Sequence, residues 1–464
     1  MAGIATKHLF ASPAAIRSFL KRVELNLLMK RVLLIAYAYP PCTEIGAARP
    51  AGLTKYLPRF GWEPTVLTVK LPGLRPTWAP VIETGDEDVL QTWKMRFGLE
   101  GRRSLHEQLH LPVTQKRDSQ LMHTKVLFAM RYLLTFPDAM KGWIPFAMQA
   151  LEQIKKSTRV DAIVTTSPPV SAHLIGRKAK PMFGCPWIAD LRDLWSQNLA
   201  QGNDLVRLLE RPVERRTLRD ADALVSVSDP WADRLRGCYP DKRVFCITNG
   251  FDADDFRPKP ETLTPAFTIT YTGRLYEGKR DPTPLFEAIQ ELIQEGAVKR
   301  EAIRVRFYGS IEPWLPVLVR SFGLEDLVEL AGTVSRDEAL RRQRESQALL
   351  MLCWSDLRET GQHTGKVFEY LGARRPILAI GGSRGVVTDL LERTKTGVHA
   401  RSKEELKDTL RAWYAEHRQT GRVLYRGEER KLDLYTHEQM ASQFADVLES
   451  VSAGKISQAC AAHV

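Results

Sequence analysis

The stretch "NGFDADDFRPKPETLTPAFTITYTG", residues 249–273, decides how the chain is organised. Its centre, residues 256–266, is mostly polar and contains three prolines, and its end is the apolar run "FTITYTG". Clusters of proline and polar residues interrupt regular structure, whereas short apolar runs rich in β-branched and aromatic residues form buried strands. The stretch therefore predicts a linker followed by the first strand of a new domain.

Strands and helical stretches alternate on both sides of this linker. Predicted strands cover residues 31–39, 64–70, 161–167, 186–191, 221–228 and 243–248 before it, and residues 267–273, 303–309, 328–334, 347–354 and 376–382 after it. Such alternation is typical of parallel α/β domains, and 464 residues exceed the size of one ordinary core. The predicted fold class is α/β, with two doubly wound, Rossmann-like domains that face each other across a cleft.

The same pattern gives the domain boundaries. We predict an N-terminal extension (1–28), a first domain (29–258), a second domain (259–435) and a C-terminal helix with a tail (436–464). Within the first domain, residues 71–145 form an insertion in which basic, aromatic and long aliphatic residues interleave. One interpretation is a surface that lies on a membrane or lines an acceptor cleft, and the other is a buried helical excursion.

Composition limits the partners and the compartment. The net charge of +12 favours anionic partners, but the chain has no zinc-finger spacing and no aromatic-rich RNA-binding motif, so nucleic acid is not expected. Six scattered cysteines without a Cys-x-x-Cys pair fit a reducing compartment, and no run of about 20 apolar residues is available to span a bilayer. The predicted location is cytoplasmic, with peripheral contact at the inner face of an anionic membrane as a further expectation.

Loops after the strands carry the candidate site residues, because parallel sheets bind ligands at the carboxyl ends of their strands. Gly46, near a helix start, permits close approach of a phosphate, with Arg49 as a further contact; an ordinary turn glycine is the alternative. Arg274 and Lys279 flank a glycine-containing turn, so both cations are expected to converge on one anion. The alternative is a pair of solvated surface charges.

The stretch "HTGKVFEYLGARRPILAIGG", residues 363–382, predicts a short helix followed by an apolar strand. Thr364, Gly365 and Lys366 fall at the helix start, where backbone N–H groups receive a phosphate. Glu369, one turn later, is placed to accept hydrogen bonds from both hydroxyls of a ribose. A single glutamate on a helix is usually just solvated, so this interpretation depends on its neighbours.

Together these stretches resemble one enzyme family. "ITYTGRLYEGKRDP" (269–282) resembles the Gly-Arg…Lys signature, and "GKVFEYLGARRPILAIGG" (365–382) the glutamate signature, of retaining glycosyltransferases of the GT-B fold, in the large family-4 group. Further similar segments are residues 33–69, 165–176, 186–198 and 244–256. The resemblance runs from about residue 29 to residue 450 and is weakest across 71–145.

The resemblance implies a transferase that moves a hexose from a nucleotide-sugar to a saccharide or lipid-linked acceptor with retention, in polysaccharide or glycolipid synthesis. Arg274 and Lys279 would bind the diphosphate, and Glu369 the ribose. The residues expected near the base are Gly309, Ser310 and Val334. It implies no metal and no cofactor, since cations and helix ends take the metal's place, and no clear Asp-x-Asp motif follows a predicted strand. It also implies that the C-terminal helix crosses back to the first domain.

Two departures from the family pattern affect the site. Gly361 stands where relatives often carry a donor-contacting Glu, with Glu359 two residues away, so backbone groups of residues 361–365 are the substitute contact. In the first domain, "ADLRDLW" offers Asp193 where many relatives place a His. We predict that Asp193 orients the acceptor hydroxyl or stabilises an oxocarbenium-like transition state; a helix cap or a salt bridge with Arg192 is the alternative.

His173 is a further candidate, although a lone His on an apolar helix is more often structural. Two other functions remain open beside sugar transfer. One is a nucleotide-sugar epimerase on the same architecture. The other is a binding protein that kept the nucleotide pocket and lost transfer, for which Gly361 is the best support.

Overall fold

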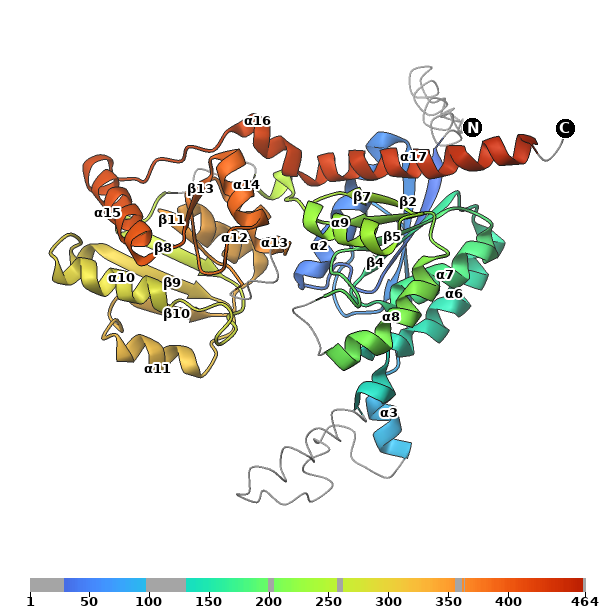
Figure 1. The fold of residues 1–464 in the computed structure, drawn as a ribbon, viewed down its shortest axis with the longest axis horizontal. Helices are drawn as coiled ribbons and strands as arrows, with labels where there is room; N and C mark the ends of the chain where they lie inside the picture. The colour runs from blue at the N-terminus through green and yellow to red at the C-terminus, as the bar shows by residue number, and fades with distance from the viewer. Residues whose placement is uncertain are drawn as a thin grey trace, which may run out of the picture.

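The computed structural model describes residues 29–96, 131–198, 204–256, 262–354, 361–362 and 364–461. The predicted extension 1–28, the centre of the insertion, part of the linker and Glu359 lie outside the described residues. The described chain forms two α/β lobes, and a long C-terminal helix runs from the second lobe over the first (Figure 1).

The first lobe is built on a parallel sheet of seven strands in the order β3-β2-β1-β4-β5-β6-β7. Its strands are β1 (Lys30–Ala36), β2 (Trp62–Val69), β3 (Val81–Thr84), β4 (Ala162–Ser167), β5 (Trp187–Leu191), β6 (Ala223–Ser226) and β7 (Arg243–Cys246). Its helices are α2 (Ala48–Tyr56), α3 (Val89–Arg96), α6 (Trp143–Ser157), α7 (Ser171–Phe183), α8 (Asp204–Leu218) and α9 (Asp229–Cys238), with 3-10 turns at Ile45–Ala47, Leu57–Phe60 and Ala139–Gly142.

The second lobe repeats this plan with six parallel strands in the order β10-β9-β8-β11-β12-β13. Its strands are β8 (Phe267–Thr272), β9 (Ile303–Tyr308), β10 (Val328–Gly332), β11 (Ala348–Leu352), β12 (Ile377–Ile380) and β13 (Gly397–Ala400). Its helices are α10 (Thr283–Gln294), α11 (Trp314–Ser321), α12 (Arg336–Glu345), α13 (Gly365–Ala373), α14 (Val386–Thr394), α15 (Lys403–Thr420) and α16 (Glu429–Leu432). Three further 3-10 turns lie at Ala253–Phe256, Arg300–Ala302 and Asp433–Tyr435.

Each sheet is buried on both faces, which explains why its strands are continuous apolar runs. One face of the first sheet packs on α6 and α7 around Trp143 and Trp187. The opposite face packs on α2 and on the last helix, α17 (His437–Ala461), whose Phe444 is fully buried there. The last helix of the chain therefore belongs to the core of the first lobe.

Two segments cross between the lobes side by side. Phe251 donates its N–H to the carbonyl of Tyr435 at 2.9 Å, and His437 donates to the carbonyl of Phe251 at 2.8 Å. A Cβ atom on Gly52 of α2 would lie 2.6 Å from the imidazole of His437, so the start of α17 is pressed against α2. The crossing is thus a paired strap rather than a single linker.

The predicted α/β class with two doubly wound, Rossmann-like domains is confirmed. The sequence patterns missed β3 and β13, which are short strands of four residues at the sheet edges. Edge strands bury less apolar surface than central ones, so they carry a weak hydrophobic signal. Within the described part of the chain, no helix has the length and apolar character needed to cross a membrane.

Candidate functional site

The strand order of each sheet reverses at one point, between β1 and β4 in the first and between β8 and β11 in the second. In open parallel sheets, ligands bind at this reversal, beyond the carboxyl ends of the strands. The loops after β8 and β11 lead to α10 and α13, and they contain most of the predicted donor-site residues. The second lobe is therefore where the site is built up below.

The loop after β1 meets the start of α13 at the junction between the lobes. A Cβ atom on Gly365 would lie 2.4 Å from Cγ1 of Ile45, far closer than carbon atoms approach. Ser228, just before α9, donates a hydrogen bond of 2.7 Å to the carbonyl of Gly361. The structure thus brings the Gly46 turn next to the helix start that carries the predicted phosphate site.

Gly361 has a packing role that explains its departure from the family pattern. A Cβ atom at this position would lie 2.4 Å from Cδ1 of Trp231, which is only 1% exposed in the core of the first lobe. Because Trp231 has no room to move, a glutamate cannot occupy position 361 while the two lobes are in this contact. The loss of the glutamate goes together with tight apposition of the lobes.

Three cations gather around a pair of aromatic rings beyond β8 and β11. Tyr276 and Trp354 pack edge to face, with ring centroids 5.9 Å apart. The Arg274 guanidinium lies 5.4 Å from the Tyr276 ring and the Lys279 ammonium 4.8 Å from the Trp354 ring. Arg280 lies 5.4 Å from the first ring and 5.8 Å from the second. Ring faces attract cations, so they hold this positive charge in place.

The two predicted diphosphate ligands stand at the rim of this cluster. The Arg274 side chain is 64% exposed, and its Nε atom lies 3.2 Å from Glu312. Lys279 is exposed above Trp354. Arg280 lies deeper: its Nε atom is buried and donates no hydrogen bond to any described residue. A buried donor without an acceptor is costly, so Arg280 is the better prepared to receive an anion.

Lys366 brings a fourth cation under the cluster. Its Nζ atom lies 4.1 Å from the centre of the Tyr271 ring and takes the space that a Cβ atom on Gly273 would fill. Burial, together with the nearby Arg280, lowers the pKa of Lys366 to about 7, and Glu369 opposes this shift. A side chain on residue 273 would therefore displace the ammonium from its place over the end of β8.

Glu369 lies one turn further along α13 in a half-buried position. Its carboxylate accepts a hydrogen bond of 3.4 Å from Gln343 and lies 3.9 Å from the Arg336 guanidinium. Burial raises the pKa of Glu369, while Arg336, the Gln343 hydrogen bond and Lys366 oppose the rise. These contacts are long, so the carboxylate can accept shorter hydrogen bonds from a ligand.

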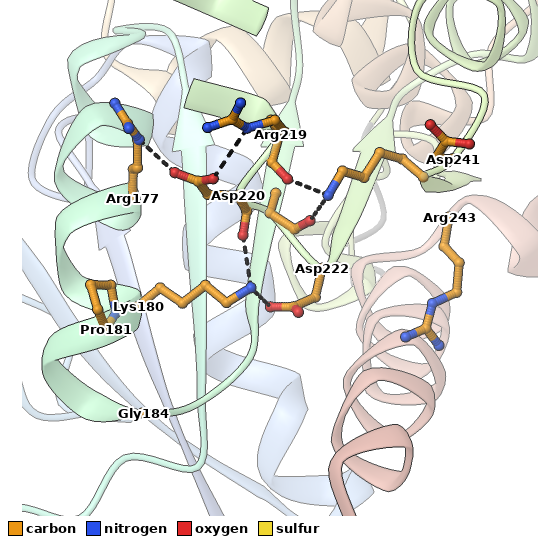
Figure 2. Close-up of a pocket in the computed structure, with 11 residues that line it drawn as sticks. Arg177, Lys180, Pro181, Gly184, Arg219, Asp220, Asp222, Asp241 and Arg243 are labelled. Carbon is orange, nitrogen blue, oxygen red and sulfur yellow. Dashed lines mark hydrogen bonds and ion pairs between the residues drawn. The ribbon is translucent and has the colours of Figure 1, made fainter. Parts of the chain in front are cut away.

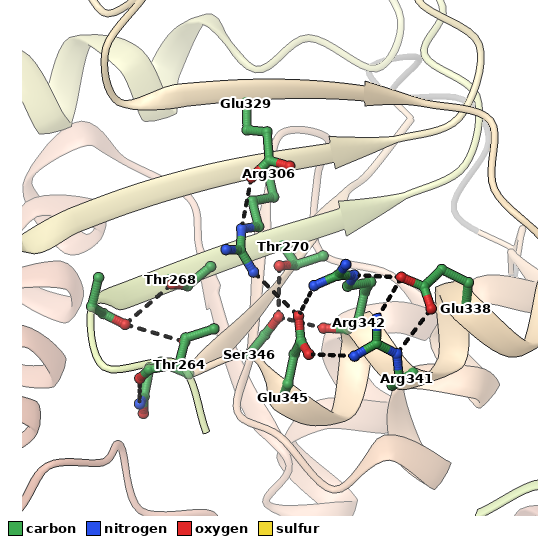
Figure 3. A network of polar contacts seen from close by, with 12 residues as sticks. Thr264, Thr268, Thr270, Arg306, Glu329, Glu338, Arg341, Arg342, Glu345 and Ser346 are labelled. Atoms are coloured by element: carbon green, nitrogen blue, oxygen red, sulfur yellow. Dashed lines mark hydrogen bonds and ion pairs between the residues drawn. The ribbon is translucent and has the colours of Figure 1, made fainter. Parts of the chain in front are cut away.

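An ion-pair network fixes α12, which supplies both Arg336 and Gln343 (Figure 3). Glu345 accepts from Arg306 of β9 at 3.2 Å and from Arg342 at 2.7 Å, and Glu338 accepts from Arg342 at 2.7 Å. Charges that share partners in this way lose less side-chain entropy for each pair than isolated surface pairs. The network holds α12 against the sheet and so positions the residues that face Glu369.

The residues predicted near the base follow β9 and β10. Gly309 has a φ of 142°, and a Cβ atom there would lie 2.3 Å from the carbonyl O of Gly273. Ser310 donates to Glu312 at 3.1 Å, and Glu312 lines a hollow of about 460 Å³ together with Arg274 and Lys279. Val334 is half-buried just before α12. The three lie on the loops beside the cation cluster.

The first lobe places Arg192 as a structural clamp. Its guanidinium donates to the carbonyls of Ser167 at 2.8 Å, Pro168 at 2.9 Å and Gly46. The carbonyl of Gly46 thus faces an arginine. Asp193 is half-buried and contributes to the electrostatic environment of Arg192.

Arg49 and Asp190 form a buried ion pair beneath this loop. Arg49 donates to the two carboxylate oxygens of Asp190 at 3.0 and 2.9 Å, and the side chains are 3% and 0% exposed. Thr166 donates a third hydrogen bond to Asp190 at 2.8 Å. Arg49 is thus committed to this pair and does not reach a phosphate, contrary to the sequence-based expectation.

His173 is structural in this fold. It is fully buried, shares a hydrogen bond of 2.7 Å between Nδ1 and the Thr165 hydroxyl, and has its pKa lowered by burial to about 4.

The edge strand β3 corrects the expectation that no Asp-x-Asp motif follows a strand, because Asp86 and Asp88 come after it in this arrangement. Asp86 accepts from Tyr37 and Asp88 caps the start of α3, so both carboxylates are used locally.

Sequence reasoning missed Arg280, Arg336 and Gln343. Arg280 directly follows Lys279 in the turn after β8, so two adjacent basic residues in that loop could have indicated a second anion ligand. Arg336 is the first residue of the helix after β10, also at the carboxyl edge of the sheet. Gln343 gave no signal, because it reaches the site from the far end of α12.

Two known protein families match the two lobes of this chain. Residues 46–250 match a family described as "Glycosyl transferase 4-like domain", and residues 284–446 match one described as "Glycosyl transferase-like". The chain belongs to the family-4-like glycosyltransferases. The resemblance stated from sequence is thereby confirmed. A search of curated proteins gives no match.

Solved structures share the fold of this glycosyltransferase. Sucrose-phosphate synthase from Thermosynechococcus elongatus has a TM-score of 0.61 and 14% identity, covering 92% of this chain and 100% of its own. HepE from Anabaena, in complex with UDP and glucose, has a TM-score of 0.58 and 13% identity over 91% of this chain and 100% of its own. A glycosyltransferase from Rickettsia africae has a TM-score of 0.56 and 14% identity, and the match covers 91% of this chain and 98% of its own. These similarities show the GT-B fold.

Proposed function

We propose that this glycosyltransferase transfers a hexose from a nucleotide-sugar to a saccharide or lipid-linked acceptor with retention, in polysaccharide or glycolipid synthesis. The observation that carries the proposal is the meeting of Lys366 and Arg280 at the start of α13, one turn from Glu369. The complexes of HepE with UDP and glucose and with UDP-glucose make UDP-sugars the first donors to test.

The diphosphate would lie over the end of β8. Lys366 and Arg280 would contact it from below, and Arg274 and Lys279 from the rim. The Thr364 side chain does not cap α13, and the N–H groups of Gly365 and Lys366 would donate to the same anion. We propose that this positive charge serves the diphosphate without a cofactor, the nucleotide-sugar being the co-substrate.

Retention would follow from the position of the leaving group. As the sugar–phosphate bond breaks, negative charge grows on the diphosphate oxygen, and the cations stabilise it more than they stabilise the bound donor. That oxygen takes the proton of the acceptor hydroxyl on the same face of the sugar. Asp193, on the opposite lobe, would orient that hydroxyl, and Gly309, Ser310 and Val334 would lie along the base.

A panel of UDP-, GDP- and dTDP-sugars, with and without acceptor, tests this function. Sugar transfer to an acceptor with release of nucleoside diphosphate is the expected result. Interconversion of the nucleotide-sugar without transfer would indicate an epimerase. Tight binding without release or conversion would indicate a binding protein, for which Gly361 remains the motivating feature. Nuclear magnetic resonance of the product's anomeric proton decides between retention and inversion.

The pKa of Lys366 predicts how donor binding depends on pH. A lysine with a pKa of about 7 is protonated below pH 7 and mostly neutral above it, whereas a bound diphosphate raises the pKa by its negative charge. Binding of UDP is therefore expected to be tightest below pH 7 and to weaken above it, by as much as about tenfold per pH unit. Titration calorimetry in buffers of different ionisation enthalpy should detect proton uptake above pH 7. Binding without proton uptake would contradict this role of Lys366.

Glu369→Ala is expected to weaken nucleotide binding by roughly 10- to 100-fold, because hydrogen bonds to a charged group contribute about 1.5–3 kcal/mol. Calorimetry with UDP measures this, and Glu404→Ala, an exposed glutamate on α15, is the matched control. The same measurement with inorganic pyrophosphate, which lacks the ribose and the base of UDP, separates the ribose contact from the phosphate contact. Equal loss for both ligands would place Glu369 in a structural role only.

A further inference from the structure

Most of the helix α8 has the reverse of the usual polarity, and only its last turn buries an apolar residue, Leu218. Helices that cover a sheet normally bury apolar residues and expose polar ones. On α8, Glu214 is fully buried, whereas Leu205, Leu208 and Leu209 are 65%, 63% and 45% exposed. Their spacing of three and four residues places the three leucines on one face of the helix.

Polar contacts inside the lobe fix this orientation. The carboxylate of Glu214 accepts hydrogen bonds from the backbone N–H of Ser196 at 2.9 Å and from the Gln197 side chain at 3.1 Å. One turn earlier, Glu210 accepts from the Tyr132 hydroxyl at 3.3 Å. The helix cannot rotate its leucines inward without unpairing the buried carboxylate of Glu214 and the half-buried one of Glu210, which is strongly unfavourable. The leucines are therefore held outward.

Positive charge continues the same face. Pro212 and Arg216 follow the leucines along the outward stripe, with Arg211 and Arg215 beside it, and all four residues are exposed. The one exposed carboxylate of the helix, Asp204 at its start, is paired with Arg207, so the face as a whole is positively charged. A helix that presents leucines together with arginines matches an anionic lipid surface, where the apolar side chains enter the acyl boundary and arginines reach the headgroups.

Two further features lie near α8 in the first lobe. Residue Leu133, next to the Tyr132 that contacts α8, is 67% exposed. Past the end of α8, Arg219 lines a hollow of about 740 Å³ (Figure 2). Its charged lining is five cations and three carboxylates: Arg177, Lys180, Arg219, Lys242, Arg243, Asp220, Asp222 and Asp241. Ion pairs of 2.7 Å (Arg177–Asp220) and 2.8 Å (Lys180–Asp222) occupy much of this charge, so the hollow adds a positive surround and is not itself the contact.

We propose that the outward face of α8, formed by Leu205, Leu208, Leu209, Arg211, Arg215 and Arg216, docks the protein on an anionic lipid bilayer. Exposed apolar groups mark an interaction surface, and the three exposed arginines, which outnumber the single paired carboxylate of Asp204, select an anionic partner over a neutral one. The link to a lipid-linked acceptor rests on the proposed function. Docking is tested without nucleotide-sugar, so a failure of the docking proposal can be told apart from a failure of the proposed function.

The test is co-sedimentation of the full chain with vesicles of phosphatidylglycerol and phosphatidylcholine, compared with phosphatidylcholine alone. Binding is expected only to the anionic vesicles and should fall as salt is raised. Leu205→Asp/Leu208→Asp should lower the partition coefficient at least tenfold, and Arg215→Gln/Arg216→Gln should reduce it and its salt dependence. Val317→Asp, an equally exposed apolar position on α11, and Arg320→Gln are the matched controls and should bind as the unmodified chain does.

Leu205→Ser/Leu208→Ser removes the leucines without adding charge, so it keeps the test valid if the aspartate variant fails to fold. Unchanged vesicle binding by the folded leucine variants overturns the proposal, as does equal binding to neutral vesicles. Loss of a dimer in sedimentation velocity with unchanged vesicle binding would also overturn it and would identify the face as a contact between copies. Nucleotide release in solution should be unaffected by the leucine variants, which separates loss of docking from loss of catalysis.

Discussion

Lys366→Ala is expected to lower turnover of the nucleotide-sugar by roughly 10²–10³, the range found when one preorganised donor to a developing anion is removed. The reason is its position. The Nζ atom stands over the end of β8 against the Tyr271 ring, in a space that exists because residue 273 is glycine. Arg280 beside it cannot take over this position, because its guanidinium is held between the Tyr276 and Trp354 rings.

Steady-state kinetics with the donor identified by the panel measures this effect. Lys156→Ala, an exposed lysine on α6, is the matched control and should retain full turnover. Arg274→Ala should cost less, about tenfold, because a mostly exposed guanidinium that already faces Glu312 contributes weakly. A larger loss for Arg274→Ala than for Lys366→Ala would move the main diphosphate contact to the rim of the cluster.

Arg49→Met is expected to destabilise the first lobe by about 3–5 kcal/mol, because it leaves the carboxylate of Asp190 buried without its cation. Besides Asp190, the guanidinium donates to the carbonyls of Ile247 and Thr248 at 2.9 Å each. It therefore ties α2 to β5 and to the segment that leaves β7. Asp190→Leu should be similarly destabilising, because it leaves the arginine unpaired.

Denaturant unfolding followed by tryptophan fluorescence measures these changes in the free energy of unfolding. The double variant Arg49→Met/Asp190→Leu should lose less free energy of unfolding than the two single variants lose together, because neither charge is then buried without its partner. Lys30→Met breaks the exposed pair with Glu449 and is the matched control, with an expected cost below about 1 kcal/mol. Additive losses in the double variant would show that Arg49 and Asp190 act independently.

The sequence was sufficient for the sheet cores and for the helix that carries Lys366 and Glu369. Central strands such as "FTITYT" are buried on both faces, so their apolar runs are unambiguous. The loop positions followed from the rule that parallel sheets bind ligands at one edge. Lys366 was assigned to the phosphate through its backbone, and the role of its side chain became visible only with Gly273 beside it.

Other features depend on residues far apart in the chain. Gly361 looked like the loss of a catalytic contact, but its neighbour is Trp231, 130 positions away and on the other lobe. Arg49 looked like a phosphate ligand, and no local pattern shows that Asp190 claims it. The inverted helix α8 was not recognised, because a leucine-rich helix predicts a buried face until Glu214 is seen to point inward.

The place of α17 has a consequence for how the chain matures. Met440, Phe444 and Leu448 complete one hydrophobic cluster of the first lobe, although they follow the whole second lobe in the chain. Domains usually fold in order as they are synthesised. Here the first lobe is completed only by a helix that is made after the second lobe, so a gene fragment that stops after the second sheet would yield a first lobe with an uncovered flank.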